Sequence, residues 1–343
     1  MSAARALAGL RLTSLAGPVP GRAVPAPPPP GAYPLPDGGP HHAAGLARRA
    51  GHDEEVVRAL RTTLGALDGA VRHEVLDPLG RRADLSGRRG RSAVRAVSVG
   101  GARARQADGT TCGSTVLGML AAAGDPVLAL WLVAGLCPGE QPSGERGGRG
   151  QDAAARLRTL QRVVKGRTNR GALGPFAWPQ ALGTPPWGAA RAARYADVRY
   201  TDRVVTDDGP RATGTTGSPV VEAALAAAAR GVPVPLFTGG DLGLGVATAV
   251  PRHVVLLTAA DLPDEAGRRT GDAPGAGRCW VYEPSSGTVH RLAARDLLAG
   301  ATDAGVRRAL GGWPHVCWAL LPAGRAGERR APAGGWAQAP RTW

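Results

Sequence analysis

The spacing of apolar residues divides the chain into a helix-rich first part and a strand-rich second part. Over 53–76 and again over 151–165, apolar residues recur every three or four positions, which predicts two amphipathic helices. Residues 115–136 are almost all apolar and are interrupted by Asp125-Pro126, which favours two buried helices over a membrane span. The prolines of 178–188 predict a segment without regular structure.

The second part of the chain has β-branched and aliphatic runs that are bounded by turn residues. Ser218-Pro219 predicts a helix start, because a capping residue is followed by proline at the first helical position. Pro284-Ser285-Ser286-Gly287 predicts the turn of a hairpin. Strands are predicted over 93–99, 195–205, 232–237, 251–258 and 315–321, and the hairpin over 278–292.

Composition sets the expected domain boundaries. The chain has 343 residues, and its 51 glycines and 30 prolines gather in stretches too poor in apolar residues to pack. Residues 1–50 are therefore expected to form a disordered arm and residues 324–343 a disordered tail. One domain is expected over 51–323, with 51–100 as its N-terminal helical extension.

The net charge of +15 would suit an acidic partner such as nucleic acid or a membrane surface. All but one of the 42 basic residues are arginine, however, and Lys165 is the only lysine. That bias, with abundant Ala, Gly and Pro, indicates a GC-rich genome rather than selection for a ligand. The arginines are also scattered, whereas a nucleic-acid site would gather them into a patch. We therefore expect no specific nucleic acid and no membrane as partner.

The cysteines exclude several classes of site. There are four, and no two stand in a CxxC spacing, so neither a metal site nor a disulfide framework is expected. His41-His42 has no further ligand nearby and is interpreted as loop. Arg5 and Arg11 interrupt the apolar stretch that a signal peptide would need. The expected location is cytoplasmic, with reduced thiols and no cofactor.

Cys112 stands where a turn gives way to a helix. Asp108-Gly109 is a turn sequence, Thr110-Thr111 can cap a helix, and an apolar run follows the cysteine. The free N–H groups and the dipole of a helix start stabilise a thiolate. Cys112 is thus a candidate nucleophile, and the alternative is a thiol that only fills space in the core.

Three further residues give Cys112 a set of partners. Gln106 stands six positions before it, His253 heads an apolar strand, and Glu283 ends the next strand before a glycine turn. This order resembles the papain-like cysteine peptidases, and most closely the group related to leader peptidases that cleave after double-glycine sequences. The segment Arg230-Gly-Val-Pro-Val234 also matches that pattern.

The resemblance covers about 104–321 and has two departures. The family more often carries Asp-Pro where this chain has Glu283-Pro284, and the residues around Cys112 match neither the Asp-Cys-Gly-Pro nor the Ser-Cys-Trp version. It implies an α+β, papain-like fold in which the helix headed by the cysteine packs on an antiparallel sheet. It also implies a peptide or protein substrate.

On this reading, the chain is a thiol-dependent hydrolase, a cysteine peptidase. Cys112 is the nucleophile and His253 the general base and acid, Glu283 orients the imidazole, and Gln106 donates to the oxyanion. The alternatives are an inactive papain-like module that binds a peptide or protein, a Cys-dependent acyl transferase and an Arg-rich nucleic-acid binder. The other Cys–His pair, His315 and Cys317, lies on one strand and is expected to be structural.

Overall fold

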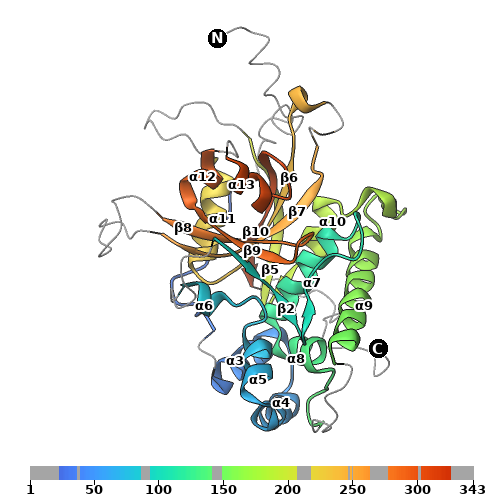
Figure 1. Ribbon diagram of the computed structural model, residues 1–343, viewed down its shortest axis with the longest axis vertical. Coiled ribbons are helices and arrows are strands. Elements are labelled where there is room, and N and C mark those ends of the chain that lie inside the picture. Colours follow the sequence, from blue (N-terminus) through green and yellow to red (C-terminus); the bar gives the residue numbers. More distant parts are fainter. Residues whose placement is uncertain are drawn as a thin grey trace.

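The computed structural model describes residues 23–36, 39–85, 93–140, 149–206, 218–245, 248, 250–262, 277–299 and 303–325. A twisted antiparallel sheet runs through the centre, and helices cover both of its faces (Figure 1). The protein is therefore α+β. In the described part of the chain, eight strands pair in the order β1-β9-β8-β7-β6-β10-β5-β4. Their bounds are Val94–Ala96 for β1, Arg194–Tyr195 for β4, Val198–Val204 for β5, Val234–Gly239 for β6, His253–Asp261 for β7, Arg278–Glu283 for β8, Thr288–Ala293 for β9 and His315–Arg325 for β10, while β2 (Ser98–Val99) and β3 (Ala102–Arg103) form a separate pair.

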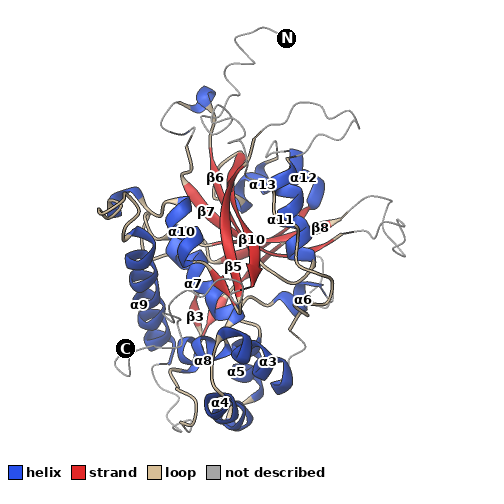
Figure 2. Cartoon of the chain, turned by 180° about the vertical axis from the view of Figure 1, so that it is seen from behind, coloured by secondary structure: helices blue, strands red, loops and turns tan. Residues whose placement is uncertain are grey.

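Strand β7 shows how one sheet serves two cores. Val254 and Leu256 belong to the core that also contains α7, whereas Val255 and Leu257 belong to the core that contains α11. This alternation follows from the two-residue period of a strand, and it buries both faces. Figure 2 shows the same layers from behind. The helices of the first core include α7 (Cys112–Gly124), α9 (Arg149–Asn169) and α10 (Pro186–Ala192), and those of the second are α11 (Pro219–Ala229), α12 (Ala294–Ala299) and α13 (Ala304–Ala309).

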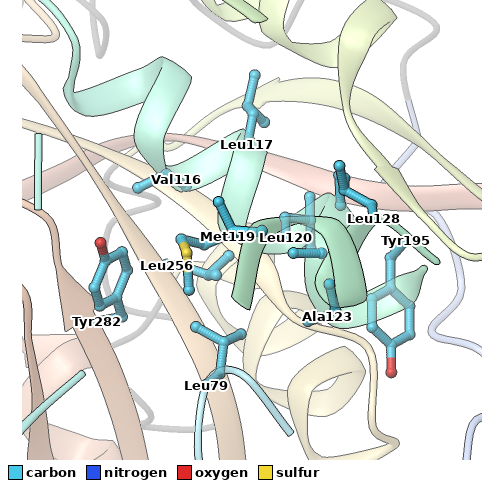
Figure 3. Packing of buried hydrophobic residues seen from close by; sticks show 14 of the residues in the cluster. Leu79, Val116, Leu117, Met119, Leu120, Ala123, Leu128, Tyr195, Leu256 and Tyr282 are labelled. Atoms are coloured by element: carbon cyan, nitrogen blue, oxygen red, sulfur yellow. The ribbon is translucent and has the colours of Figure 1, made fainter. Parts of the chain in front are cut away.

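Helix α7 is the central helix of the first core, and every one of its residues is buried. Figure 3 shows its side chains Met119 and Leu120 packed with Leu256 of β7, and Tyr282 of β8 lies beside them. The phenol of Tyr282 also donates to the Ala104 carbonyl oxygen at 2.6 Å. This packing sets the start of α7 against the sheet, which fixes the position of Cys112 relative to β7 and β8.

The apolar run 115–136 forms two helices, as predicted. Helix α7 ends at Gly124 and α8 covers Pro126–Ala134, with a bend of 114° between them. Asp125 makes the break, because its carboxylate accepts the N–H groups of Val127 and Leu128 and so begins a new helix. In the described part of the chain, no single helix is long and apolar enough to cross a membrane, and α7 and α8 reach that length and composition only when counted together.

Two predictions for the N-terminal region are wrong. The helix expected over 53–76 is divided into α4 (Glu54–Ala66) and α5 (Gly69–Leu76), because Asp68 caps the second helix through the N–H groups of Ala70 and Val71. The disordered arm expected over 1–50 contains α3 (Pro40–Ala50).

The ordered part of the arm is held by contacts that its composition does not reveal. Helix α3 buries a face of small residues that includes Ala43 and Ala47. The phenol of Tyr33 donates to Asp197, and Arg230 donates to the Pro28 carbonyl oxygen at 2.7 Å. Residues 1–22 of the predicted arm and 326–343 of the predicted tail lie outside the described residues.

The segment 178–188 also corrects a prediction, since it contains the 3-10 helix η1 (Gln180–Leu182) and the first turn of α10. Pro186 is the first residue of α10, a position where a missing N–H costs nothing. The predicted strand 195–205 becomes the hairpin of β4 and β5, which turns at Ala196 with a φ of 50°. The remaining described elements are the short helix α6 (Arg81–Leu85) and the 3-10 helix η2 (Leu242–Leu244).

Candidate active site

Cys112 is the first residue of α7, and it is 6% exposed. A tight turn precedes it, in which the Thr111 N–H donates to the Asp108 carbonyl oxygen. The Asp108 carboxylate accepts the N–H of Thr110 at 2.7 Å, which closes the turn from the other side. The first N–H groups of a helix have no acceptor within the helix. The thiol therefore lies beside backbone donors that point out of the helix start.

His253 lies between Cys112 and Glu283. It is the first residue of β7, and its Nε2 is 2.9 Å from Glu283 Oε1. The imidazole also has a hydrogen bond with the Cys112 thiol. Burial lowers the pKa of His253, but the hydrogen bonds and charges of Cys112 and Glu283 outweigh burial and raise this pKa to about 9. The surroundings of His253 therefore favour the positively charged form of its imidazole.

Glu283 ends β8, and the following turn wraps around its carboxylate. Oε1 accepts the Ser285 N–H at 2.7 Å, and Oε2 accepts the N–H and the hydroxyl of Ser286 at 2.8 and 2.7 Å. Burial raises the pKa of Glu283, but the hydrogen bonds of His253, Ser286 and Ser285 lower it to about 2. The long Glu side chain reaches both the imidazole and its own turn, which gives a physical reason for Glu at this position.

The hydrogen-bond network continues past Glu283. The Ser286 hydroxyl is 2.6 Å from the Thr288 hydroxyl, which is 2.9 Å from His290 Nε2. Burial lowers the pKa of His290, which favours its neutral form. Hydroxyl groups thus connect the negative carboxylate of Glu283 to a second buried histidine.

Gln106 lies beside the turn that follows Glu283. Its backbone N–H donates to the Pro284 carbonyl oxygen at 2.8 Å, and its Oε1 accepts the Ser285 hydroxyl at 3.3 Å. Its Nε2 donates to the Asp108 carbonyl oxygen at 2.8 Å, which leaves the second N–H of the amide for another acceptor. The Gln106 side chain is thus held between the turn after Glu283 and the turn before Cys112.

Helix α9 holds the loop that leads to Cys112, through two residues that were not singled out as site residues. Gln161 is 1% exposed, accepts the Ala107 N–H at 3.0 Å and donates to the Arg105 carbonyl oxygen at 2.9 Å. Lys165 donates to the Thr110 hydroxyl. The only signal in the sequence is their spacing of four residues, which places both on one helix face, together with the rarity of lysine.

A pocket of about 230 Å³ opens beside Cys112 and His253. Of the described residues that line it, only Arg252 and His253 have ionisable side chains apart from the cysteine. The other lining residues are Gly109, Ala181, Leu182, Gly183, Thr184, Phe237, Pro251 and Val254. Asn169 Nδ2, 3.3 Å from the Gly183 carbonyl oxygen, ties one wall of the pocket to the end of α9.

Gly311 and Gly113 give the site its close packing. Gly311 has a φ of +70°, and a Cβ on it would lie 2.1 Å from Cδ2 of His253. A Cβ on Gly113 would lie 2.7 Å from Oγ1 of Thr184. Only glycine leaves room for the imidazole at the first position and for the pocket wall at the second. Sequence reasoning missed both, because each contact joins segments far apart in the chain.

The second Cys–His pair is arranged differently. His315 Nε2 is 3.1 Å from Asp241 Oδ2, and the Cys317 thiol donates to the His315 carbonyl oxygen at 3.9 Å. All four cysteines are free of disulfide bonds. Among the described residues, no group of three or more His, Cys, Asp and Glu side chains could hold a metal ion.

Comparison with protein-family models, with curated proteins and with solved structures found no match to this chain.

Proposed function

We propose that the protein is a thiol-dependent hydrolase with a papain-like arrangement, which cleaves peptide amide bonds. The observation that carries this proposal is the position of the His253 imidazole, hydrogen-bonded to the Cys112 thiol on one side and to the Glu283 carboxylate on the other. A nucleophile, a base and a group that orients the base are the parts that acyl transfer to a side chain needs.

The chemistry proceeds in two steps. His253 takes the proton of Cys112, and the Sγ attacks the carbonyl carbon of the substrate to give a tetrahedral intermediate. The C–N bond then breaks, His253 gives its proton to the leaving amine, and an acyl thioester stays on Cys112. In the second step, His253 removes a proton from water, the water oxygen attacks the thioester, and the thiol is released with the acid product.

Backbone and side-chain donors stabilise the oxyanion of each step. The N–H groups at the start of α7, where Cys112 is the first residue, have no acceptor within the helix, and Gln106 has one amide N–H not used by Asp108. In comparable sites, one such donor contributes about 3 kcal/mol to stabilising the transition state. Glu283 stays negative because its pKa lies at about 2, so it favours the imidazolium that forms when Cys112 loses its proton.

Alkylation of Cys112 tests the activated nucleophile. The chain would carry Cys137→Ser, because Cys137 is exposed and would also react, whereas Cys279 and Cys317 are 0% exposed and, unlike Cys112, do not line the pocket. At about pH 6, iodoacetamide is expected to label Cys112 about 10²-fold faster than glutathione, and H253Q is expected to remove the difference. If Cys112 in the protein with native His253 reacts no faster than glutathione, the proposal is contradicted.

Peptide cleavage separates a hydrolase from an inactive module of the same fold. The protein is incubated with a mixed peptide library, and new termini are identified by mass spectrometry. Cleavage is expected with the native Cys112 and not with Cys112→Ala, which keeps the buried position filled without a nucleophile. Equal cleavage by both proteins, or no cleavage by a protein whose Cys112 alkylates rapidly, would contradict peptide hydrolysis.

A further inference from the structure

The pocket beside Cys112 has one permanent charge, and it is positive. Arg252 directly precedes His253 and lines the same pocket, while no carboxylate is found among the described lining residues. Its backbone N–H donates to the Thr238 carbonyl oxygen at 2.8 Å, so β6 fixes the base of the side chain. Arg252 thus lines the pocket of the nucleophile directly before the general base, and its backbone is fixed by β6.

The Arg252 side chain is exposed and has no hydrogen bond or ion pair with another described residue. Several other arginines have such partners: Arg95 pairs with Asp84 at 2.6 Å, and Arg81 donates to Tyr195 and to the Gly231 carbonyl oxygen. Lys165, which lies near the loop that leads to Cys112, already donates a hydrogen bond to the Thr110 hydroxyl. Arg252 is therefore a cation at the pocket that the described fold leaves available to a ligand.

The chemistry of that cation limits what it would bind. A guanidinium presents a planar fork of N–H donors that matches the two oxygens of a carboxylate. Leu182, Phe237 and Pro251 supply uncharged walls to the same pocket, and an ion pair next to apolar surface is screened less than one in open solvent. Apart from the Cys112 thiolate, no described lining side chain would repel a negative group, and the +15 charge of the chain would attract one.

We infer that Arg252 binds a carboxylate of the substrate, so that the enzyme prefers peptides with an acidic group next to the bond that is cleaved. The inference rests on the proposed function, because it concerns the substrate of the same site. The acidic group is either an Asp or Glu side chain or the free C-terminal carboxylate of a short peptide, and both present the same chemistry to the arginine.

Two alkylating reagents test the charge preference without a known substrate. Iodoacetate carries a carboxylate and iodoacetamide is its neutral counterpart, so the ratio of their rates at Cys112 reports attraction of an anion. R252Q, in the Cys137→Ser background, is expected to lower the iodoacetate rate about tenfold relative to the iodoacetamide rate. The control R295Q removes the same charge from α12, on the other side of the sheet, where Arg295 is 77% exposed, and it should leave both rates unchanged.

These rates distinguish the proposed role of Arg252 from the proposed activation of Cys112. An equal ratio of rates in the native protein and R252Q, with fast iodoacetamide labelling in both, would overturn the role of Arg252 and leave the nucleophile intact. A slow iodoacetamide reaction in the native protein would overturn the proposed function, and with it the inference. An equal fall in R252Q and R295Q would assign the effect to the overall charge and would also overturn the inference.

Matched peptides identify the source of the carboxylate. Each library peptide that is cleaved is resynthesised with Glu, Gln or Lys on either side of the cleaved bond, and with a free or an amidated C-terminus. The native protein is expected to favour one acidic form about tenfold in kcat/KM, R252Q to lose the preference and R252E to favour Lys. A preference that persists in R252Q would overturn the inference.

Discussion

A cysteine, a histidine and an acidic residue lie near one another at two places in the molecule, and the two sets are built differently. Cys112, His253 and Glu283 come from the start of α7, the start of β7 and the end of β8. Because they belong to different elements, their side chains can converge, and the imidazole contacts both the thiol and the carboxylate. The second set, Cys317, His315 and Asp241, places the first two on one strand.

In the second set, the cysteine and the imidazole have different hydrogen-bond partners. The Cys317 thiol donates to the His315 backbone carbonyl oxygen, and the His315 ring pairs with Asp241. Cys317 is fully buried, and a Cβ on Gly239 would lie 3.1 Å from its Sγ. The comparison teaches that a Cys, a His and an acid make a candidate site only when separate elements bring them into line beside a pocket.

The largest expected effect comes from removing the charge of the orienting acid. E283Q should lower peptide cleavage about 10³-fold, because an amide can donate to His253 Nε2 and favour the wrong tautomer, and because it cannot balance the imidazolium. D241N makes the same change in the second set and should leave cleavage unchanged. Circular dichroism confirms that both variants fold. Equal losses in the two variants would show that the sets do not differ as their geometry indicates.

A methyl group on Gly311 should have the next largest effect. G311A would place a Cβ 2.1 Å from Cδ2 of His253 at a φ of +70°, so the imidazole must move, and cleavage should fall about 10²-fold. G312A is the matched control, since its φ is +91° and nothing lies within 4 Å of its added Cβ. That control should lose only about 1 kcal/mol of folding stability to backbone strain, measured by urea unfolding.

If G311A and G312A lose stability and activity equally, the packing of Gly311 on His253 does not position the imidazole.

The two histidines also differ in exposure, because the side chain of His315 is 28% exposed, whereas that of His253 is 8% exposed. The closed packing around His253 is therefore a second difference between the two sets, independent of hydrogen bonding.

Stability should depend on pH through His253. Its pKa in the folded protein, about 9, lies above its ordinary value of about 6.5, so the folded protein holds this proton more tightly than the unfolded chain. The resulting stabilisation is complete below about pH 6.5 and is lost as the pH rises through 9. The free energy of unfolding relative to H253Q should therefore decrease by about 2 kcal/mol between pH 6.5 and about pH 8.

Urea unfolding at a series of pH values measures this decrease. In the E283Q background the slope should become shallower, because the hydrogen bond and the charge of Glu283 are among the causes that raise the pKa of His253. A difference between native protein and H253Q that stays constant over this pH range would contradict the ion pair that the proposed mechanism uses.

Much of the layout was predictable from local patterns. The strand headed by His253, the hairpin that carries Glu283 and the helix that begins at Cys112 all follow from runs of apolar residues and their turn or capping residues. The order of helices and strands then made convergence of these residues an expectation, and the described structure brings them together. What such patterns show is which residues begin and end an element.

Contacts between distant segments could not be predicted in this way. Gly311 stands in an ordinary turn sequence, and only its approach to His253 explains it. The bond from Tyr33, in the proline-rich stretch before α3, to Asp197 likewise joins residues far apart in the chain. The break at Asp68 was missed because the apolar spacing continues across it, while the capping carboxylate decides where the second helix begins.

The smallest expected effect concerns Lys165, which supports the loop before Cys112 from outside the site. Its ammonium donates to the Thr110 hydroxyl, and that hydroxyl donates in turn to Asp108 at 2.7 Å. K165M keeps a buried side chain of similar length but removes the charge. A hydrogen bond to a charged group contributes about 1.5–3 kcal/mol. Because Thr110 keeps its bond to Asp108, only part of this is lost, and peptide cleavage should fall about fivefold. R162M, on the exposed face of α9, is the control and should cleave like the native protein. A loss in K165M as large as that in E283Q would mean that the lysine acts in the chemistry itself, and no loss would mean that Gln161 alone holds the loop.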